Sequence, residues 1–281
     1  MKIIETNTLL QALGVKITRL KILAPAIAKK ASPGQFIALM VSENGERIPL
    51  TIVESDIEKG TITLIVQEIG LSTKLLGAMK EGESLYSLVG PLGHATEIKN
   101  YGKIIVIGGG VGIAEIYPVA RGFKAAGNRV EAILGARTKD LLILEGELRK
   151  VSDDVKIATD DGSYGRKGFV TDILKEAFTQ HPASSAEYGL VYAVGPIPMM
   201  KAVSSVTKGF GVKTLVSLNA LMVDATGMCG GCRVTVGGKV KFTCVDGPEF
   251  DAQGVDWEEL EKRNRVYEDK EKHICKLKNI K

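Results

Sequence analysis

The sequence lacks the features that mark several classes of protein. It has no apolar run near the roughly 20 residues needed to cross a bilayer. Its first stretch, MKIIETNTLLQALG, has no small-residue cleavage site after an apolar core, so we expect no signal peptide. It also has no dense tract of Lys and Arg, and its net charge is only +4 over 281 residues. We therefore expect neither a membrane protein nor a nucleic-acid-binding protein.

Cysteine and histidine are also scarce. Of the four cysteines, Cys229, Cys232 and Cys244 lie in one short segment. This clustering is unlike a secreted disulfide framework, and in a reducing cytosol it favours a metal site. We therefore predict a cytoplasmic protein with a metal centre. The three histidines are scattered, and we assign none of them a catalytic role: His94, His181 and His273.

What the sequence does contain is typical of a globular protein, with 44% hydrophobic and 25% charged residues. Residues 1–96 carry short β-type runs (VKITRLKI, QFIALMVS, PLTIVES, GTITLIVQEI, SLYSLVG) separated by turn signals such as ASPGQ and ENGE. Strands at this spacing predict a small antiparallel barrel or sandwich, interrupted by one short helix around STKLLGAM.

The pattern changes at about residue 97. Residues 97–215 alternate buried strands, such as KIIVIGGG and YGLVYAVG, with helical stretches, such as IAEIYPVARGFKAAG. This alternation predicts a parallel α/β domain. Residues 216–281 hold the cysteine segment and a charged, helical tail. The sequence thus predicts a β + α/β protein with an N-terminal antiparallel β-barrel, a parallel α/β nucleotide-binding domain and a small C-terminal segment.

One glycine-rich motif lies between a predicted strand and a predicted helix. In GGGVGIAE, the glycines are Gly108, Gly109, Gly110 and Gly112. Glycines at such a turn let the backbone approach a pyrophosphate, whose negative charge the helix N-terminus favours. The spacing departs from G-x-G-x-x-G, because Glu115 stands where a third glycine would fall. A tight turn without a ligand is the alternative.

Two motifs in the first part could hold a second phosphate-bearing ligand. In RIPLT, Arg47 could bind a phosphate, and Thr51 could present a hydroxyl group to a ring. In EIGLSTKLL, Gly70, Ser72 and Thr73 stand at a predicted helix start, which is a potential anion site. An ordinary strand start and simple helix capping are the alternatives.

The cysteine segment matches part of the plant-type iron–sulfur spacing, C-x₄-C-x₂-C…C. The missing first position falls on Asp224, followed by Cys229, Cys232 and Cys244. A carboxylate is anionic and can ligate iron. Two alternatives use Cys275: a zinc ribbon with Cys275 as fourth ligand, or an iron centre with Cys275 as ligand and Asp224 capping a turn.

Taken in order, RIPLT, EIGLSTKLL, LVGPLG, IVIGGGVGIAE, ILGARTKDLLI, DDGSYGRKGFVTD and YAVGPIPMM resemble the ferredoxin–NADP reductase superfamily. With the cysteine segment, the chain looks like the branch that holds the electron-transfer subunit of dihydroorotate dehydrogenase. It is still more similar to the small subunit of NADH-dependent reduced ferredoxin:NADP oxidoreductase, or sulfide dehydrogenase. Asp at position 224 resembles that second family, whereas the dihydroorotate branch has Cys there. The resemblance thus implies Asp224 as the fourth ligand.

The resemblance also implies the roles of the motifs. It implies FAD at the first part, a 2Fe–2S cluster at the cysteines and NAD(H) at the α/β domain. The flavin positions are Arg47, Pro49, Leu50, Thr51, Gly70, Ser72 and Thr73. The pyridine-nucleotide positions are Gly108, Gly109, Gly110, Gly112, Gly195, Pro196 and Met199. The metal ligands are Asp224, Cys229, Cys232 and Cys244. Relatives often have Pro at the position of Glu115.

The resemblance implies an electron-transfer flavoprotein subunit that converts between two-electron and one-electron transfer. Its implied partner is a larger flavin and iron–sulfur subunit, with which it would form an electron-bifurcating heterodimer of the transhydrogenase type. The alternatives are a subunit of dihydroorotate dehydrogenase, a stand-alone NAD(P)H reductase and a zinc-stapled binding module. Trp257, Leu260 and Tyr267 in the tail suit either a partner interface or a helix packed on its own domain.

Overall fold

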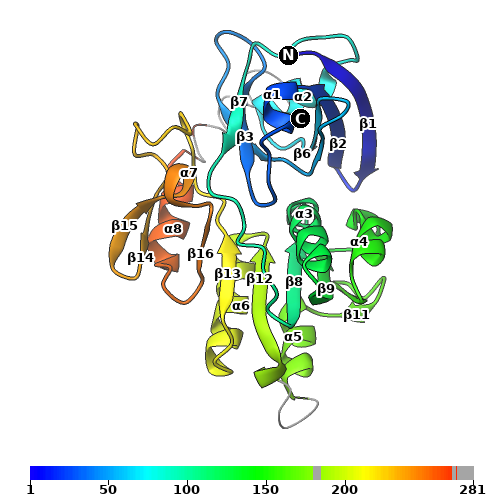
Figure 1. Cartoon of the computed structure of the whole chain (residues 1–281), viewed down its shortest axis with the longest axis vertical. Helices are drawn as coiled ribbons and strands as arrows, with labels where there is room; N and C mark the ends of the chain where they lie inside the picture. Colours follow the sequence, from blue (N-terminus) through cyan, green and yellow to red (C-terminus); the bar gives the residue numbers. More distant parts are fainter. Residues whose placement is uncertain (180–184, 268–269, 271–281) are drawn as a thin grey trace. The chain divides into compact units, whose positions relative to one another are not determined.

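The computed structural model describes residues 1–179, 185–267 and 270 (Figure 1). His181, His273 and Cys275 lie outside these residues. The chain divides into two compact units. The first comprises Met1–His94, Ala220–Pro248 and Asp256–Lys281, and the second comprises Ala95–Asn219 and Glu249–Val255. The three-part division at residues 96 and 215 remains a prediction.

The N-terminal part of the first unit is built from two antiparallel sheets. One has the order β1-β2-β6-β5 and the other β4-β3-β7. The strands are β1 (Ile3–Ala12), β2 (Val15–Leu23), β3 (Phe36–Met40), β4 (Ile48–Thr51), β5 (Glu54–Asp56), β6 (Thr61–Gln67) and β7 (Ser87–Leu92). Two helices accompany them, α1 (Pro25–Ala28) and α2 (Leu71–Ala78).

Side chains from both sheets enclose one core. Leu20 of β2, Leu64 of β6 and Leu39 of β3 are fully buried in it. In β2, the buried Leu20 and Ile22 alternate with more exposed neighbours, as expected for a strand with one face on the core, whereas β6 is buried over nearly all its length. The strand β1 is not among the predicted runs, because its burial pattern is mostly intermediate or exposed and its residues include many polar ones.

The second unit is a seven-stranded sheet of order β11-β10-β9-β8-β12-β13-β16. Its strands are β8 (Lys103–Gly109), β9 (Arg129–Ala136), β10 (Asp154–Thr159), β11 (Arg166–Lys167), β12 (Tyr188–Val194), β13 (Thr214–Ser217) and β16 (Glu249–Asp251). All neighbouring pairs are parallel except β13 with β16. Thus β16, which follows the cysteines in the chain, pairs with the edge of the nucleotide-binding sheet.

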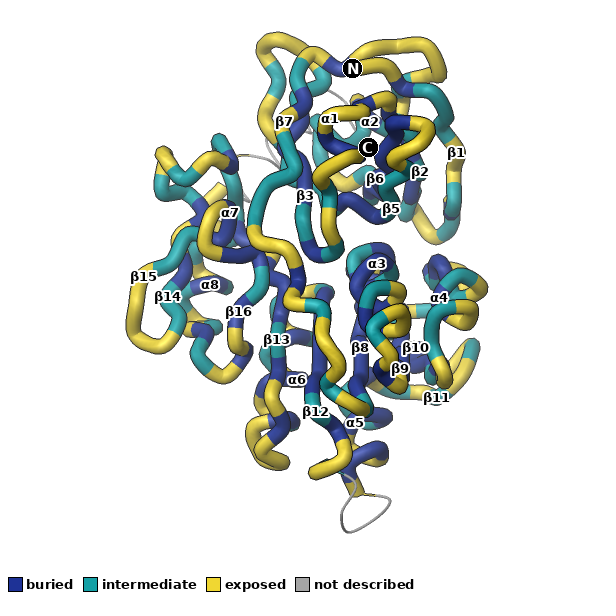
Figure 2. The backbone as a smooth tube through the Cα atoms, in the orientation of Figure 1, coloured by how far each residue is buried: buried dark blue, intermediate teal, exposed yellow. Residues whose placement is uncertain are grey.

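Helices connect the strands of this sheet. They are α3 (Gly112–Ala125), α4 (Glu145–Val151), α5 (Val170–Thr179) and α6 (Ile197–Gly209), with short 3₁₀ turns η1 (Lys139–Leu141) and η2 (Ser185–Glu187). α3 contacts α4, and α5 contacts α6. Figure 2 shows β8 and β12 buried over nearly all their length, as strands are when both faces of a parallel sheet are covered.

The cysteine segment forms a small hairpin flanked by short helices. β14 (Arg233–Val236) pairs with β15 (Lys239–Phe242), and the helices are α7 (Thr243–Asp246) and α8 (Trp257–Asn264). Asp256 caps α8 by accepting a hydrogen bond from the N–H of Glu259 at 2.9 Å. Among the described residues, no helix has the length and apolarity that a bilayer crossing requires.

Candidate functional site: two nucleotide-binding turns and a cysteine loop

The two predicted flavin motifs come together in the barrel. The Ser72 hydroxyl, in the first turn of α2, donates a hydrogen bond to Glu46 Oε2 at 2.7 Å. Glu46 is the neighbour of Arg47, so the contact brings the RIPLT strand beside the start of α2. An exposed guanidinium and the free N–H groups of a helix N-terminus are both anion-binding groups. Their convergence fits a ligand that carries phosphates.

The side chains of this flavin site have different surroundings. Leu50 packs against the barrel core, so strand alternation places Pro49 and Thr51 on the opposite face. Gly70 precedes α2, and a Cβ added there would meet open space. Thr73 accepts hydrogen bonds from the N–H groups of Ile69 and Gly70, each at 3.0 Å. Thr73 therefore shapes the loop.

The predicted pyridine-nucleotide residues lie at the carboxyl ends of two adjacent strands. β8 ends at Gly109 and β12 ends at Val194. The chain runs from β8 outward to β9 and β10, and then returns to β12 and continues to β13 on the other side. The β8–β12 boundary is thus the topological switch point, where open α/β sheets bind their ligands.

Close packing at this point requires glycine. A Cβ at Gly112 would lie 2.6 Å from the carbonyl oxygen of Val194, and a Cβ at Gly109 would overlap the sulfur of Met199. Gly110 adopts φ +58° with open space around it. The β8–α3 turn therefore packs against the β12–α6 turn that holds Gly195 and Pro196, and it leaves backbone exposed at the N-terminus of α3. This geometry fits a pyrophosphate.

The cysteine loop brings two of its sulfurs into contact. Cys232 and Cys244 are buried, and their Sγ atoms are 3.2 Å apart. Burial, followed by the hydrogen bond with Cys232, raises the pKa of the Cys244 thiol to about 12. Metal ligation requires thiolates, so a metal that binds here must displace these protons.

The other two predicted ligands lie on the exposed side of the loop. The Asp224 carboxylate accepts hydrogen bonds from the N–H groups of Thr226, at 2.8 Å, and Cys229, at 3.1 Å. The Thr226 N–H bond is the main cause that lowers the pKa of Asp224. Cys229 is exposed and its sulfur accepts from the N–H of Gly231 at 3.3 Å. Asp224 is thus already an acceptor that organises the loop.

Two of the predicted ligands lie together as one iron of a two-iron cluster requires, whereas the zinc alternative depends on Cys275, which lies outside the described residues. A zinc ion needs four ligands around a single point. Among the described residues, no group of three or more His, Cys, Asp or Glu side chains could hold a metal ion. A 2Fe–2S cluster needs only two protein ligands per iron, and Cys232 with Cys244 form such a pair. The loop therefore fits the cluster.

The flavin and cysteine sites belong to the same unit and touch. Arg47 Nη1 donates to the backbone oxygen of Asp224 at 3.4 Å. The family resemblance implies a role of Arg47 toward FAD alone. The contact became visible only in the fold, because the two residues are 177 positions apart.

The C-terminal helix packs on its own unit. Leu260 of α8 is fully buried, and Glu259, Arg263 and Asn264 make hydrogen bonds to the cysteine segment. Of the two alternatives for the tail, the structure supports a helix packed on its own domain, at least as far as Asn264. The sequence could not reveal these hydrogen bonds, because polar residues on a short helix are usually exposed to solvent.

Two family models match parts of this chain. The family model of the iron–sulfur cluster binding domain of dihydroorotate dehydrogenase B matches residues 219–256. The model of the oxidoreductase NAD-binding domain matches residues 106–205. The chain is 48% identical to a dihydroorotate dehydrogenase B electron transfer subunit homolog of Thermotoga maritima, over 89% of this chain and 86% of that protein. It is 30% identical to the electron transfer subunit of Fusobacterium nucleatum, over 85% and 93%.

Solved structures give the same result. A chain from the structure of NADH-dependent reduced ferredoxin-NADP oxidoreductase, solved to study flavin-based electron bifurcation, superposes with a TM-score of 0.90. It is 43% identical and the match covers 100% of this chain and 98% of that one. Amycolatopsis cytochrome P450 reductase GcoB, at 22% identity and a TM-score of 0.60, shares the fold.

The chain therefore belongs to the family of dihydroorotate dehydrogenase B-type electron-transfer subunits, within the ferredoxin–NADP reductase superfamily. The predicted fold, a β-barrel followed by an α/β domain, is confirmed. The protein is a redox enzyme subunit whose cofactors are FAD, a 2Fe–2S cluster and NAD(H).

Proposed function

We propose that this chain is the small subunit of a ferredoxin:NADP oxidoreductase complex of the electron-bifurcating kind, and that it moves electrons between NAD(H) and a larger flavin and iron–sulfur subunit. The contact between Arg47 and the backbone of Asp224 carries the proposal. This contact joins the RIPLT motif to the cysteine loop within one unit, which supports an electron path inside the chain. The cytoplasm is the proposed location.

Each site has a separate task in this proposal. When bound, FAD exchanges an electron pair with the nicotinamide, and the 2Fe–2S cluster exchanges single electrons. Arg47 and the N-terminus of α2 bind the flavin pyrophosphate, with Gly70 and Ser72 forming the loop. The Thr51 hydroxyl would offer a hydrogen bond to the flavin ring, and Pro49 and Leu50 shape the strand that carries it.

The nucleotide is held in the second unit. The N-terminus of α3, opened by Gly108, Gly109, Gly110 and Gly112, binds the pyrophosphate. Gly195, Pro196 and Met199 form the β12–α6 turn, which would hold the nicotinamide. No side chain in this proposal acts as a nucleophile or general base, because the chemistry belongs to the cofactors.

The cluster ligands are the pair Cys232 and Cys244 together with Asp224 and Cys229. The loop already directs N–H groups at the Cys229 sulfur and the Cys232 sulfur, from Gly231 at 3.3 Å and Cys244 at 3.5 Å. N–H donors to sulfur stabilise the negative charge of a bound thiolate.

Cofactor analysis of the purified protein tests this proposal. We expect FAD, iron and acid-labile sulfide in a ratio of 1:2:2 per chain, as one FAD and one 2Fe–2S cluster require. We also expect the flavin to bleach on anaerobic addition of NADH, and a larger subunit to co-purify. A colourless protein that carries zinc would overturn the proposal. A monomer that reduces soluble acceptors at full rate would favour a stand-alone reductase.

A dihydroorotate dehydrogenase subunit is the second candidate, since relatives with that name reach 30% identity or more. Asp224 argues against it, because the dihydroorotate branch resembles this chain with Cys in place of that Asp. Co-purification with a dihydroorotate-oxidising subunit would decide in its favour.

A further inference from the structure

The helix α8 runs along the cysteine segment and holds it at three points. Glu259 Oε2 accepts from the N–H of Thr235 at 3.0 Å, and Asn264 Oδ1 accepts from the N–H of Leu221 at 3.1 Å. Arg263 Nη2 donates to the carbonyl oxygen of Gly231 at 3.0 Å. These points lie before, within and after the stretch that contains the first two cysteines.

α8 is itself firmly placed. Leu260, on one face of α8, is fully buried. Asp256 caps the first turn of the helix, and its N–H donates to the backbone oxygen of Thr235 at 2.9 Å. Its first turn is acidic and its last turn is basic, which suits the helix dipole. Side chains on such a helix are better positioned than side chains on a loop.

The contact of Arg263 falls at the centre of the proposed cluster site. Gly231 lies between Cys229 and Cys232, and its N–H donates to the Cys229 sulfur at 3.3 Å. The same glycine therefore faces a ligand with its N–H and α8 with its carbonyl group. The Gly231 carbonyl shares its peptide plane with the N–H of Cys232, so a hydrogen bond from Arg263 orients the peptide that leads into that ligand.

Arg263 brings a charge as well as a hydrogen bond. Its Nε is buried and has no hydrogen-bond partner in the part of the chain that the structure describes. No ion pair joins its guanidinium to a carboxylate there. A guanidinium keeps its charge in proteins, and a buried charge is costly unless an anion or hydrogen bonds compensate it. An anionic cluster beside Gly231 would supply that compensation.

We propose that Arg263 is a positioning residue of the iron–sulfur cluster, one that holds Gly231 and favours the reduced cluster through its positive charge. The inference rests on the proposed function of Asp224, Cys229, Cys232 and Cys244 as ligands. On reduction the cluster gains one electron, which the flavin loses, and Arg263 exchanges neither electron nor proton. The added negative charge is stabilised by a nearby cation.

Three substitutions separate the charge from the hydrogen bond. Arg263→Lys keeps the charge, Arg263→Gln keeps a donor without the charge, and Arg263→Met removes both. Each is made in the full chain with its partner subunit, and the cluster potential is measured by redox titration followed by EPR. Arg265→Gln, an exposed residue at the end of the same helix, is the matched control for loss of one charge.

We expect Arg263→Gln and Arg263→Met to make reduction about tenfold less favourable, which is ~59 mV for a one-electron couple. Arg263→Lys and Arg265→Gln should stay within about twofold of the wild type, and Arg263→Met should also lose iron and sulfide on gel filtration. Equal potentials in all variants, with or without cluster loss, would overturn the inference and leave a structural role. A wild-type protein without a cluster would instead refute the proposed function.

Discussion

At the scale of single residues, Asp224 is both a hydrogen-bond acceptor for its own loop and a proposed ligand. Three substitutions distinguish these roles. Asp224→Asn keeps an acceptor for the N–H groups of Thr226 and Cys229 but loses the anionic ligand, Asp224→Ala loses both, and Asp224→Cys supplies a thiolate. We expect Asn and Ala to lose more than half of the iron and sulfide, and Cys to retain both with a changed cluster potential.

The control for this experiment is Cys275→Ser, which lies outside the described residues and should leave iron and sulfide unchanged. Full cluster content in Asp224→Asn would show that the carboxylate only caps the loop. Cluster loss in Cys275→Ser with a normal EPR spectrum in Asp224→Ala would make Cys275 the fourth ligand.

Arg47 belongs to the same scale. Arg47→Ala removes a charge-assisted contact with the FAD pyrophosphate, and such contacts contribute roughly 1.5–3 kcal/mol. We expect the dissociation constant of FAD to rise by roughly 10- to 150-fold, measured as flavin fluorescence released on dilution. Lys29→Ala, another exposed cation of the barrel, is the matched control. Equal FAD affinity in wild type and Arg47→Ala would show that Arg47 does not bind the FAD pyrophosphate.

At the scale of elements, the sequence predicted well where a motif and its element coincide. The glycines after β8 and the cysteines of the loop stand out by their local spacing, and the family resemblance then implies their roles, which stay predictions. The hydrogen bonds of Arg263 to Gly231 and of Glu249 to Thr96 and Tyr192 could not be predicted, because each joins residues distant in sequence. A three-residue strand such as β16 is too short for any periodicity to reveal it.

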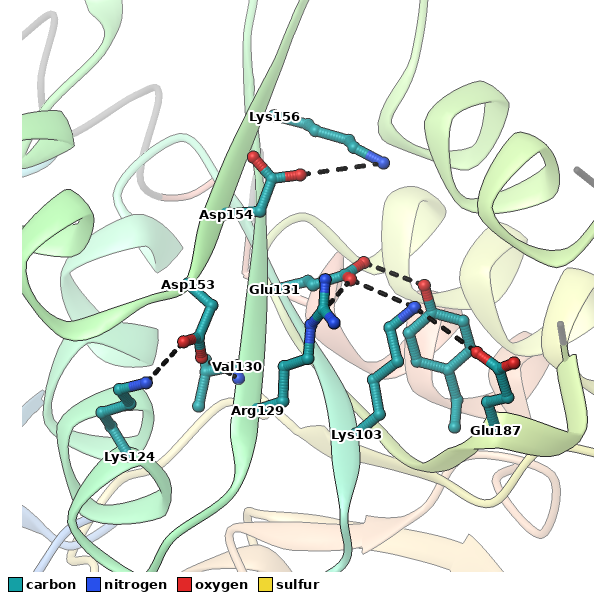
Figure 3. Close-up of polar contacts among 10 residues, drawn as sticks. Lys103, Lys124, Arg129, Val130, Glu131, Asp153, Asp154, Lys156 and Glu187 are labelled. Carbon is teal, nitrogen blue, oxygen red and sulfur yellow. Dashed lines mark hydrogen bonds and ion pairs between the residues drawn. The ribbon is translucent and has the colours of Figure 1, made fainter.

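The sheet also contains a buried polar network that sequence does not reveal. Glu131 of β9 is buried, accepts from the Tyr188 hydroxyl at 2.8 Å and pairs with Lys103 at 3.2 Å (Figure 3). These groups come from β9, β12 and β8, so the network joins three adjacent strands. The positive charge of Lys103 and the hydroxyl group of Tyr188 offset the cost of burying the Glu131 carboxylate.

Glu249, at the start of β16, gives a prediction about pH. Its Oε1 accepts hydrogen bonds from the hydroxyl groups of Thr96, at 2.5 Å, and Tyr192, at 2.8 Å. Burial raises the pKa of Glu249 above its ordinary value of 4.5. Burial, together with Glu249 and with Glu115 of α3, keeps the pKa of Tyr192 well above its usual range, so Tyr192 remains a donor.

A carboxyl group whose pKa is raised on folding stabilises the fold in its protonated form. Its contribution to the free energy of unfolding is fully present below pH 4.5 and is lost as the pH rises through the raised pKa. Glu249→Gln keeps the acceptor oxygen and removes the charge. We expect its free energy of unfolding to exceed the wild type by roughly 1–2 kcal/mol at pH 8, and the difference to shrink toward pH 4.5.

Thermal unfolding of both proteins across this pH range measures the effect, with a rise of Tm of about 2–5 °C at pH 8. Glu258→Gln, an exposed acid of α8, is the control and should show no such pH-dependent difference. If Glu249→Gln is less stable than the wild type at pH 8, the site stabilises the ionised carboxylate instead of disfavouring it.

At the scale of the whole molecule, the choice between NADH and NADPH follows from charges at the carboxyl edge of the sheet. Arg137 follows β9 and could meet a 2′-phosphate. Asp160 and Asp161, after β10, lie next to it, because their N–H groups donate to the backbone oxygens of Ala136 and Arg137, each at 3.2 Å. Ser163 holds the Asp161 carboxylate at 2.7 Å and lowers the pKa of Asp161, which therefore stays charged.

Two exposed carboxylates beside one arginine disfavour the additional negative charge of a 2′-phosphate. We therefore expect kcat/KM to be at least about tenfold higher for NADH, a preference that needs only ~1.4 kcal/mol. Steady-state reduction of an artificial acceptor with each nucleotide measures it. Asp160→Asn should improve the use of NADPH while leaving NADH within a few-fold, and Arg137→Ala should affect NADPH more than NADH. A higher kcat/KM for NADPH in the wild type would mean that Arg137 prevails over the two carboxylates.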